Sequence, residues 1–280
     1  MTSNQVAISL RDKTLSLESP VIMGILNVTP DSFSDGGKYN SVQQAVDAVG
    51  AMVLEGAAII DIGGESTRPG ADPVSESEEL DRVIPVLEQV LNVFPDTFFS
   101  IDSTKYHVAE QSLKLGAHII NDVSGLQKEP RLAELCATYK AGYVLMHSQG
   151  NPQTMQKNPE YENVIEDIFL FLEERIEQLR LAEVSSIMVD PGIGFGKTLQ
   201  HNLDIIKELK KFITLDCPVL VGASRKSMIG KLLDDRPADG RMAGTLAVHY
   251  HCLLNGAKIL RVHDVQEAVD SIKIFESLKS

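Results

Sequence analysis

The sequence predicts a single (β/α)8 (TIM) barrel. Three observations favour this fold class. The chain of 280 residues is 43% hydrophobic, short apolar runs alternate with helical patterns along its whole length, and the apolar runs end in polar residues. Such alternation is typical of parallel strands joined by crossover helices. Because α/β barrels reach about 250 residues as one unit, we expect residues 1–280 to form one domain.

The amino-terminal segment, residues 1–18, is expected to form a β-hairpin. Val6, Ile8 and Leu10 alternate with polar residues, and Leu15 and Leu17 alternate again after a short turn. Alternation with a period of two indicates strands with one buried face. We expect this hairpin to close the amino-terminal mouth of the barrel.

Eight apolar runs follow and are the predicted barrel strands. They are residues 21–27, 58–62, 98–102, 118–122, 143–147, 187–190, 219–223 and 258–263. Between them, Ser41 can cap the first crossover helix, and Ser75 with Glu78 has the spacing of a capping box. Residues 265–278 carry apolar residues at helical spacing and form the predicted last helix.

Two other architectures are disfavoured by their missing glycines. A doubly wound dinucleotide-binding sheet would place G-x-G-x-x-G after the first strand, where this chain has NVTPDSFSDGG. The segment DPGIGFGKT is similar to a phosphate loop, but a Walker motif needs Gly at the position of Pro191. We therefore expect its glycines to allow a tight turn after Asp190 and to keep Phe195 near the mouth of the barrel.

Charge and cysteine content exclude several function classes. The formal net charge is −13 and no run of Lys or Arg stands out, so nucleic acid and anionic membranes are not expected partners. Cys136, Cys217 and Cys252 are far apart and lack C-x-x-C spacing, which favours a reducing compartment. The chain has neither a signal-peptide pattern at its start nor an apolar run as long as a membrane span, and we expect a cytoplasmic protein.

Polar side chains are concentrated at the ends of the predicted strands, which a barrel gathers on one face. They are Asn27, Asp61, Glu65, Asp102, Asn121, Asp122, His147, Asp190, Ser224, Arg225, Arg261 and His263. Any one of them can be a cap or turn residue, but their number indicates an active site. Arg261 and His263, two apart on a strand, project to the same side and suit a phosphate group. Ion pairing with Asp264 or another carboxylate is the alternative.

The segments after the first two strands are candidate covering loops. TPDSFSDGGKYN and GGESTRPGADPVSESE are rich in Gly, Pro and Ser, as mobile loops often are. Arg68 and Thr67 lie in the second of them, and a solvated loop tip is the alternative for both. No metal cage is evident, because His249 and His251 are two apart on a predicted helix and do not share a face. A magnesium ion that is held mainly by substrate phosphates needs only one or two oxygen ligands from the protein, so the sequence would show little sign of it.

Seven motifs in chain order resemble those of the dihydropteroate synthase family of folate biosynthesis. They are MGILNVTPDSFSDGG, DIGGESTRPGA, SID, INDVSG, VDPGIGFGK, SRKSMIG and RVHDV, and together they cover roughly residues 20 to 280. INDVSG alone would fit the wider group of pterin-binding barrels, but STRPG and SRKS resemble the synthases in particular. The resemblance implies a transferase that condenses 6-hydroxymethyl-7,8-dihydropterin pyrophosphate with p-aminobenzoate.

The resemblance also implies a role for individual residues. The pterin pyrophosphate substrate would be bound by Thr67, Asp102, Asn121, Met146, Asp190, Phe195, Lys226, Arg261 and His263, with Arg68 joining Arg261 and His263 at the pyrophosphate. Phe33, Pro69 and Phe195 would surround the p-aminobenzoate ring, and Ser227 would receive its carboxylate. Asn27 would contact Mg²⁺, and Arg68, Lys226 and Asp102 would be the catalytic residues.

The family's mechanism, as the resemblance implies it, is dissociative: pyrophosphate leaves first and the neutral aniline nitrogen attacks the pterin methylene cation. A homodimer is the implied assembly, and sulfonamides would be inhibitors of such a site. Two rival functions stay open on the sequence. A pterin-binding methyltransferase barrel should lack the two covering loops and SRKS, and a catalytically silent pterin binder should bind ligand without turnover.

Overall fold

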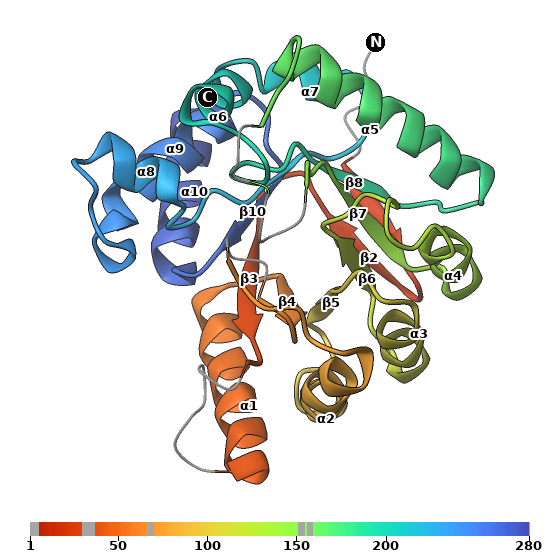
Figure 1. Cartoon of the computed structure of the whole chain (residues 1–280). Coiled ribbons are helices and arrows are strands. Elements are labelled where there is room, and N and C mark those ends of the chain that lie inside the picture. The colour runs from red at the N-terminus through yellow and green to blue at the C-terminus, as the bar shows by residue number, and fades with distance from the viewer. Residues whose placement is uncertain (1–5, 30–36, 67–69, 151–154, 156–158, 280) are drawn as a thin grey trace.

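The computed structural model describes residues 6–29, 37–66, 70–150, 155 and 159–279 of the chain. Eight parallel strands form one sheet in the order β8-β7-β6-β5-β4-β3-β10-β9. A bridge between Val189 and Val219 joins the two ends of this order, so the sheet closes into a barrel with helices around it (Figure 1). The predicted fold class, a (β/α)8 barrel with an amino-terminal hairpin, is confirmed.

Each barrel strand lies where the sequence predicted it, with shifts of one residue, except at β9. The strands are β3 (Val21–Asn27), β4 (Ile59–Gly63), β5 (Phe98–Asp102), β6 (Ile119–Asp122), β7 (Gly142–Met146), β8 (Ile187–Asp190), β9 (Leu220–Val221) and β10 (Ile259–Val262). The helices are α1 (Gly37–Glu55), α2 (Glu76–Val93), α3 (Tyr106–Leu115), α4 (Leu132–Tyr139), α5 (Val164–Leu181), α6 (Leu199–Lys207), α7 (Lys210–Ile213), α8 (Ser227–Leu232), α9 (Met242–Leu254) and α10 (Val265–Leu278), with a 3₁₀ turn at Ala238–Arg241.

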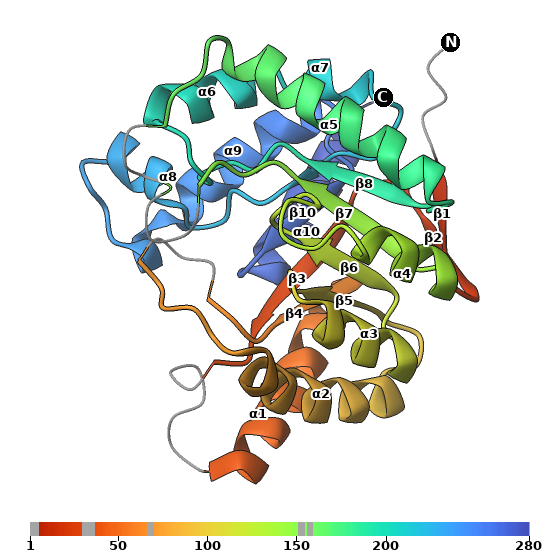
Figure 2. The ribbon, with the colours of Figure 1, turned by 45° about the vertical axis from the view of Figure 1, so that its right-hand side comes forward.

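The hairpin closes the end of the barrel at which the strands begin (Figure 2). Its strands β1 (Ala7–Leu10) and β2 (Lys13–Ser16) pair antiparallel. Of the apolar side chains that the alternation predicted to be buried, Ile8, Leu10, Leu15 and Leu17 pack against inward residues of the barrel strands, whereas Val6 is exposed. Lys258 Nζ also donates to the carbonyl of Leu17, 2.8 Å away. This end of the barrel is thus filled with apolar side chains, so a ligand site is left to the opposite end.

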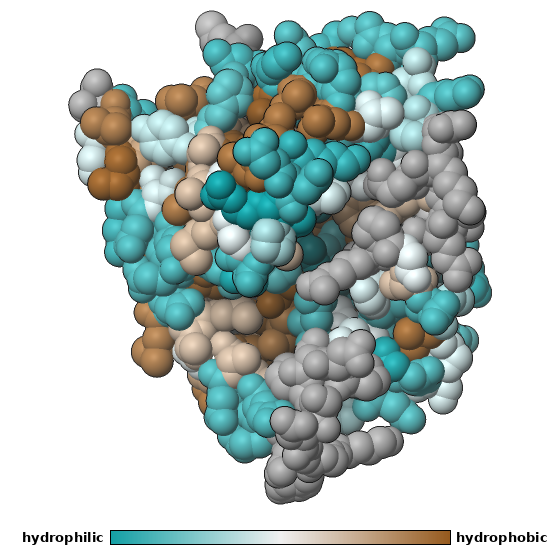
Figure 3. All heavy atoms as spheres, turned by 60° about the vertical axis from the view of Figure 1, so that its left-hand side comes forward, coloured by the Kyte–Doolittle hydropathy of each residue, from teal (hydrophilic) through white to brown (hydrophobic). Residues whose placement is uncertain are grey.

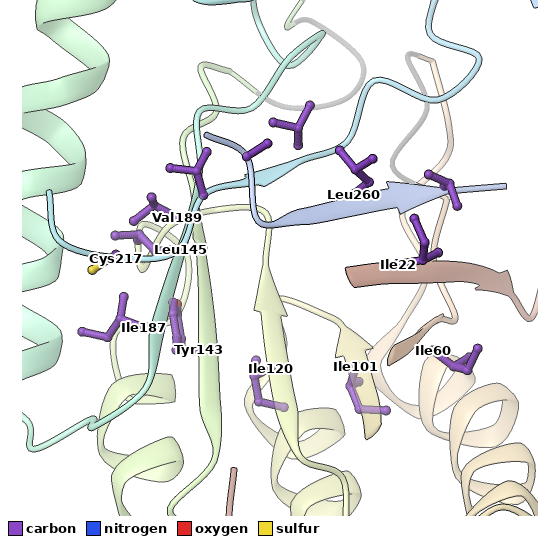
Figure 4. Packing of buried hydrophobic residues seen from close by; sticks show 14 of the residues in the cluster. Ile22, Ile60, Ile101, Ile120, Tyr143, Leu145, Ile187, Val189, Cys217 and Leu260 are labelled. Atoms are coloured by element: carbon purple, nitrogen blue, oxygen red, sulfur yellow. The ribbon is translucent and has the colours of Figure 1, made fainter. Parts of the chain in front are cut away.

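A second, larger core fills the space between the barrel and its helices. The residues labelled in Figure 4 come from most of the barrel strands and belong to this core: Ile22, Ile60, Ile101, Ile120, Tyr143, Leu145, Ile187, Val189 and Leu260, with Cys217. They are the outward-facing residues of the alternation. Full burial of such side chains stabilises the fold by roughly 1.5 to 3 kcal/mol each, and it holds the strand ends rigidly in place.

The helix ends partly differ from the sequence predictions. Ser75 caps α2 by accepting from the Glu78 amide, but the Glu78 carboxylate pairs with Arg82 instead of completing a capping box. The prediction for Ser41 is wrong, because α1 already begins at Gly37. An unpredicted capping box begins α6, where the side chains of Thr198 and His201 each accept from the other residue's amide. α10 has the predicted bounds.

The face in Figure 3 carries hydrophilic residues over much of its surface, with hydrophobic ones between them. Across the described part of the chain, no helix combines the length and the apolar character needed to cross a membrane. Cys136, Cys217 and Cys252 are buried and carry free thiols.

Candidate active site at the carboxyl ends of the strands

The side chains inside the barrel change from apolar to polar along five of the eight strands, β4, β5, β6, β8 and β10. The first inward positions are Met23, Ile59, Phe98, Ile119, Val144, Met188, Leu220 and Ile259, and all of them contribute to the core beneath the hairpin. Successive side chains of a strand point to opposite faces, so the next inward residue follows two positions later. Those positions are Ile25, Asp61, Ser100, Asn121, Met146, Asp190, Gly222 and Arg261. The polar face predicted from the strand ends therefore lies inside the barrel, above an apolar floor.

Arg261 is held by two carboxylates from other strands. Its Nε donates to Oδ2 of Asp61 at 2.6 Å, and a terminal nitrogen donates to Oδ2 of Asp102 at 2.8 Å. Asn121 Nδ2 donates to the same Asp61 oxygen at 2.9 Å. Asp61 is 0% exposed and its Oδ1 has no partner within the described residues. β4, β5, β6 and β10 thus meet in one buried polar network.

Asp102 carries a strongly perturbed carboxyl in this network. Burial raises its pKa to about 7; Arg261 lowers the pKa, while Asp61, Glu79 and Asp122 raise it further. A carboxyl with this pKa changes its protonation state near neutral pH. Carboxyls of this kind cluster at functional sites.

Asp190 ends β8 with its carboxylate buried. Oδ1 accepts from the amide of Gly192 at 2.7 Å. Burial raises the pKa of Asp190, and the ammonium of Lys226 opposes this rise. A Cβ atom on Gly222 would lie 3.8 Å from Oδ2 of Asp190 and 3.8 Å from Cβ of Arg261. The glycine therefore keeps space open between the carboxylate and the arginine.

Lys226 lies beside Asp190 and precedes α8. Its Nζ donates to the carbonyl of Ile193 and lies 4.5 Å from the centre of the Phe195 ring, within the range of a cation–π interaction. Burial lowers the pKa of Lys226 to about 8, against the opposing effect of Asp190. A cation, an aromatic ring and a carboxylate thus lie together around the loop that follows β8.

His263 lies just beyond the end of β10 and is half-buried. Its Nδ1 is 3.0 Å from Oγ of Ser224, which also accepts from the His263 amide at 3.2 Å. The sequence left open an ion pair between Arg261 and Asp264. In the structure Asp264 pairs with Arg225 instead, whose Nε donates to Asp264 Oδ2 at 2.9 Å. Arg261 does pair with carboxylates, but with those inside the barrel.

Three other candidate residues lie at strand or helix ends. Met146 is buried at the end of β7, beside Asp190 in the sheet register. Asn27 ends β3 half-buried, and a Cβ on Gly63 would lie 3.8 Å from its Oδ1. Ser227 is exposed as the first residue of α8. Within the described ranges, three or more His, Cys, Asp or Glu side chains do not gather anywhere as a potential metal cage.

Four predicted site residues, Phe33, Thr67, Arg68 and Pro69, lie outside the described residues. The chain just before the last three is tied to the barrel. Glu65 Oε1 accepts from the amide of Val74 at 3.4 Å, and its Oε2 is 2.5 Å from Nζ of Lys105. Lys105 also pairs with the buried Glu79 of α2.

Two residues of the site region were not singled out from the sequence. Asp61 was only one of many polar strand residues, although a charged side chain two places after Ile59 on the inward face was a usable signal. Lys197 appeared only in the rejected phosphate-loop motif. In the structure it is fully buried and contacts His147 and Phe195. Nothing in its sequence position distinguishes it from an exposed lysine.

Inside this barrel, buried hydrogen-bond acceptors lie next to positively charged side chains above an apolar floor. Such a site suits a small polar ring that carries an anionic group. The family model for pterin binding enzymes matches residues 23–263. The dihydropteroate synthase of Haemophilus influenzae is 47% identical over 268 residues, which are 95% of this chain and 96% of that protein. The chain therefore belongs to the pterin binding enzyme family, as a member of its dihydropteroate synthases.

Solved structures agree with this assignment. The Yersinia pestis dihydropteroate synthase in a sulfonamide drug complex has a TM-score of 0.91 and 45% identity, and covers 98% of this chain and 99% of its own. The Xanthomonas albilineans dihydropteroate synthase with 4-aminobenzoic acid has a TM-score of 0.91 and 38% identity, covering 98% of each chain.

Proposed function

We propose that this protein condenses 6-hydroxymethyl-7,8-dihydropterin pyrophosphate with p-aminobenzoate to give dihydropteroate and pyrophosphate. The observation that carries the proposal is the buried network of Asp61, Asp102, Asn121 and Arg261 facing Asp190 and Lys226 at the carboxyl ends of the strands. It offers acceptors and donors for a planar heterocycle together with positive charge for a leaving phosphate group.

Asp190 is the main acceptor for the pterin. Its carboxylate suits the amino-pyrimidine edge of the ring, which presents two parallel N–H groups. Asn121 gives one amide hydrogen to Asp61, so its oxygen and its second N–H are left for the ring. Asp102 lies against the same ring, Met146 and Phe195 pack on it, and Lys226 and Thr67 contact the substrate.

The bond to the leaving group breaks first. The C–O bond from the pterin methylene to pyrophosphate ionises, and the electron pair leaves with the pyrophosphate. Arg261 and His263, which their neighbours hold in place, receive that charge together with Arg68, and positive groups held ready in this way lower the barrier. The aniline nitrogen of p-aminobenzoate then attacks the methylene cation and loses a proton. The protein orients the reactants and excludes water, and no covalent enzyme intermediate is needed.

p-Aminobenzoate binds between the loops and the start of α8. Phe33, Pro69 and Phe195 surround its ring, and Ser227 receives its carboxylate. The Xanthomonas albilineans relative is solved with 4-aminobenzoic acid, and the exposed position of Ser227 at the start of α8 supports the same carboxylate contact here. Sulfonamides, which carry the same aniline ring, compete for this position.

Asn27 is the residue that would contact Mg²⁺. A single amide oxygen at the end of β3, with no cage of His, Cys, Asp or Glu among the described residues, fits an ion that keeps several waters and binds mainly through substrate phosphates. When bound, the ion would neutralise charge on the pyrophosphate. We also infer one domain over residues 1–280, a cytoplasmic location and a homodimer, the last of which analytical ultracentrifugation tests.

The decisive experiment measures pyrophosphate release and dihydropteroate formation, with Mg²⁺ and with EDTA, in the presence and absence of p-aminobenzoate. Product that requires both substrates and Mg²⁺ supports the proposal. Product formation at the full rate in EDTA would contradict the role of Mg²⁺ but not the synthase reaction. Tight pterin binding without product would favour a methyltransferase-type barrel or a non-catalytic pterin binder instead.

A further inference from the structure

Lys197 is a buried lysine in the loop between β8 and α6, and it is 2% exposed. Its Nζ lies 3.0 Å from Nδ1 of His147, 3.3 Å from the carbonyl of His147 and 2.9 Å from the carbonyl of Phe195. An ammonium group has three N–H donors and no acceptor. The two carbonyls accept from Nζ, and the His147 ring nitrogen, whose role depends on its tautomer, completes the three contacts.

Burial of this lysine lowers the stability of the fold more than packing alone would require. Removing an ammonium from water costs several kcal/mol even after relaxation, and a methionine of similar length would fill the space without that cost. Burial lowers the pKa of Lys197 well below its ordinary value and the charge of Lys226 lowers it further, while the charge of Asp190 opposes the shift. His147 accepts through Nδ1, and burial together with Lys197 lowers its pKa to about 2, so its ring is neutral.

The contacts of Lys197 join two segments that lie against each other without intervening side chains. A Cβ on Gly192 would lie 1.9 Å from the His147 carbonyl oxygen, and a Cβ on Gly196 would lie 2.3 Å from the Gln149 carbonyl oxygen. Both glycines have positive φ, 72° and 64°. The loop after β8 therefore lies directly on the chain that follows β7, and Lys197 links the two.

The linked loop carries much of the recognition site. The Gly192 amide holds Asp190, the Ile193 carbonyl accepts from Lys226, and Phe195 lies under the Lys226 ammonium. Two further attachments hold the loop: Oδ1 of Asn202 on α6 accepts from the Gly194 amide at 2.6 Å, and the hydroxyl of Tyr161, in the chain between β7 and α5, donates to the Gly196 carbonyl at 2.8 Å. Loss of the Lys197 contacts would leave the loop attached at Asn202 and Tyr161 but would remove its side-chain link to His147 at the end of β7.

We propose that Lys197 is a positioning residue of the pterin site: its ammonium clamps the loop after β8 onto His147 and thereby sets Asp190, Phe195 and the carbonyl that anchors Lys226. The inference rests on the proposed function, since it assumes that these groups bind a pterin. Lys197 itself acts through them and need not touch the substrate.

The test compares Lys197→Met with Lys258→Met. Lys258 is a half-buried lysine that donates to a carbonyl at the hairpin end of the barrel, so the same change there removes a similar contact far from the site. Calorimetry with 6-hydroxymethylpterin, and separately with inorganic pyrophosphate and Mg²⁺, gives the readout. We expect Lys197→Met to weaken pterin binding at least about tenfold and pyrophosphate binding less than about twofold, while Lys258→Met changes neither.

Three outcomes overturn the inference: unchanged pterin binding in Lys197→Met, an equal loss of pterin and pyrophosphate binding, or an equal loss of pterin binding in Lys258→Met. If Lys197→Met does not fold, Lys197→Gln, which keeps two donors, is measured against the same limits, and its failure to fold would make Lys197 purely structural. A wild-type protein that binds no pterin would instead contradict the proposed function.

Discussion

Arg261 on β10 donates its Nε to Oδ2 of Asp61 on β4 over 2.6 Å, although the two residues are 200 positions apart in the chain. Asp61 is completely buried, and the same oxygen accepts from Asn121. One carboxylate therefore orients two side chains that we propose to bind the substrate, Asn121 at the pterin ring and Arg261 at the pyrophosphate. Asp102 is the second carboxylate partner of the Arg261 guanidinium.

Replacing Asp61 tests this relationship. We expect Asp61→Ala to lower the free energy of unfolding by about 3 kcal/mol, because a partly buried guanidinium loses one of its two carboxylates. It should also weaken pterin binding. Asp61→Asn, which keeps the shape, should retain more of both. Urea unfolding and calorimetry check this, and equal values for wild type and Asp61→Ala would show that Asp102 alone orients Arg261.

Asp190→Ala should abolish detectable pterin binding while the barrel stays folded. Two hydrogen bonds to a charged group would be lost, which corresponds to at least about a 100-fold loss of affinity. Circular dichroism checks the fold and calorimetry the affinity. Asp204→Ala, on the outer face of the barrel, is the matched control. A variant at position 190 with normal affinity would refute the assignment.

The pH dependence of stability should carry the signature of Asp102. Its pKa is raised in the folded protein to about 7 from an ordinary value of 3.8, so the folded state binds more protons than the unfolded state between these values. Stability from this group therefore falls as pH rises from about 4 to about 7. Asp102→Asn should remove that part of the slope in denaturant unfolding across this range. Parallel pH profiles for the two proteins would contradict the assignment.

Arg68→Ala should slow turnover by about 100-fold, the typical effect of losing one group that stabilises developing charge. Pterin binding should change much less, because a covering loop acts late in the cycle. Single-turnover kinetics and calorimetry separate the two effects. A greater loss of ground-state affinity than of turnover would argue against a role in the covering loop. Arg131→Ala, at the exposed pair with Glu129, is the control.

Leu10→Ala should destabilise the protein by about 2 to 5 kcal/mol without changing kcat/KM. Leu10 is fully buried at the hairpin end of the barrel. Its side chain packs against Gly142, on which an added Cβ would lie 2.4 Å from Cδ2 of Leu10. Leu54, which is 90% exposed, gives the control substitution. A fall in kcat/KM in the folded Leu10→Ala protein would show that the hairpin end influences the site.

Much of the fold follows from local pattern. Alternation in residues 1–18 predicted the hairpin, and the bounds of β3, β5, β8 and α10 coincide with predicted segments because their apolar runs are sharply bounded by polar or turn residues. The strand β9 is shorter than predicted, since only Leu220 and Val221 pair along β10. Ser41 was misplaced because a good capping residue can also lie inside a helix.

The resemblance of short motifs identified the family, and the order of polar residues at strand ends placed the site. Side-chain alternation is local, so Asp102, Asn121, Asp190 and Arg261 could be assigned to one face without coordinates. The sequence by itself thus determined the fold class and the family, and it predicted the end of the barrel at which we propose the site.

Only the tertiary structure decided which of these groups meet. The partners of Arg261 are Asp61 and Asp102 rather than Asp264, and Lys197 is buried against His147 rather than exposed at the surface. The physical reason is that barrel closure brings together side chains far apart in the chain. Their burial, and hence the pKa of Asp102 and Lys226, depends on the whole surrounding shell and not on neighbours in the sequence.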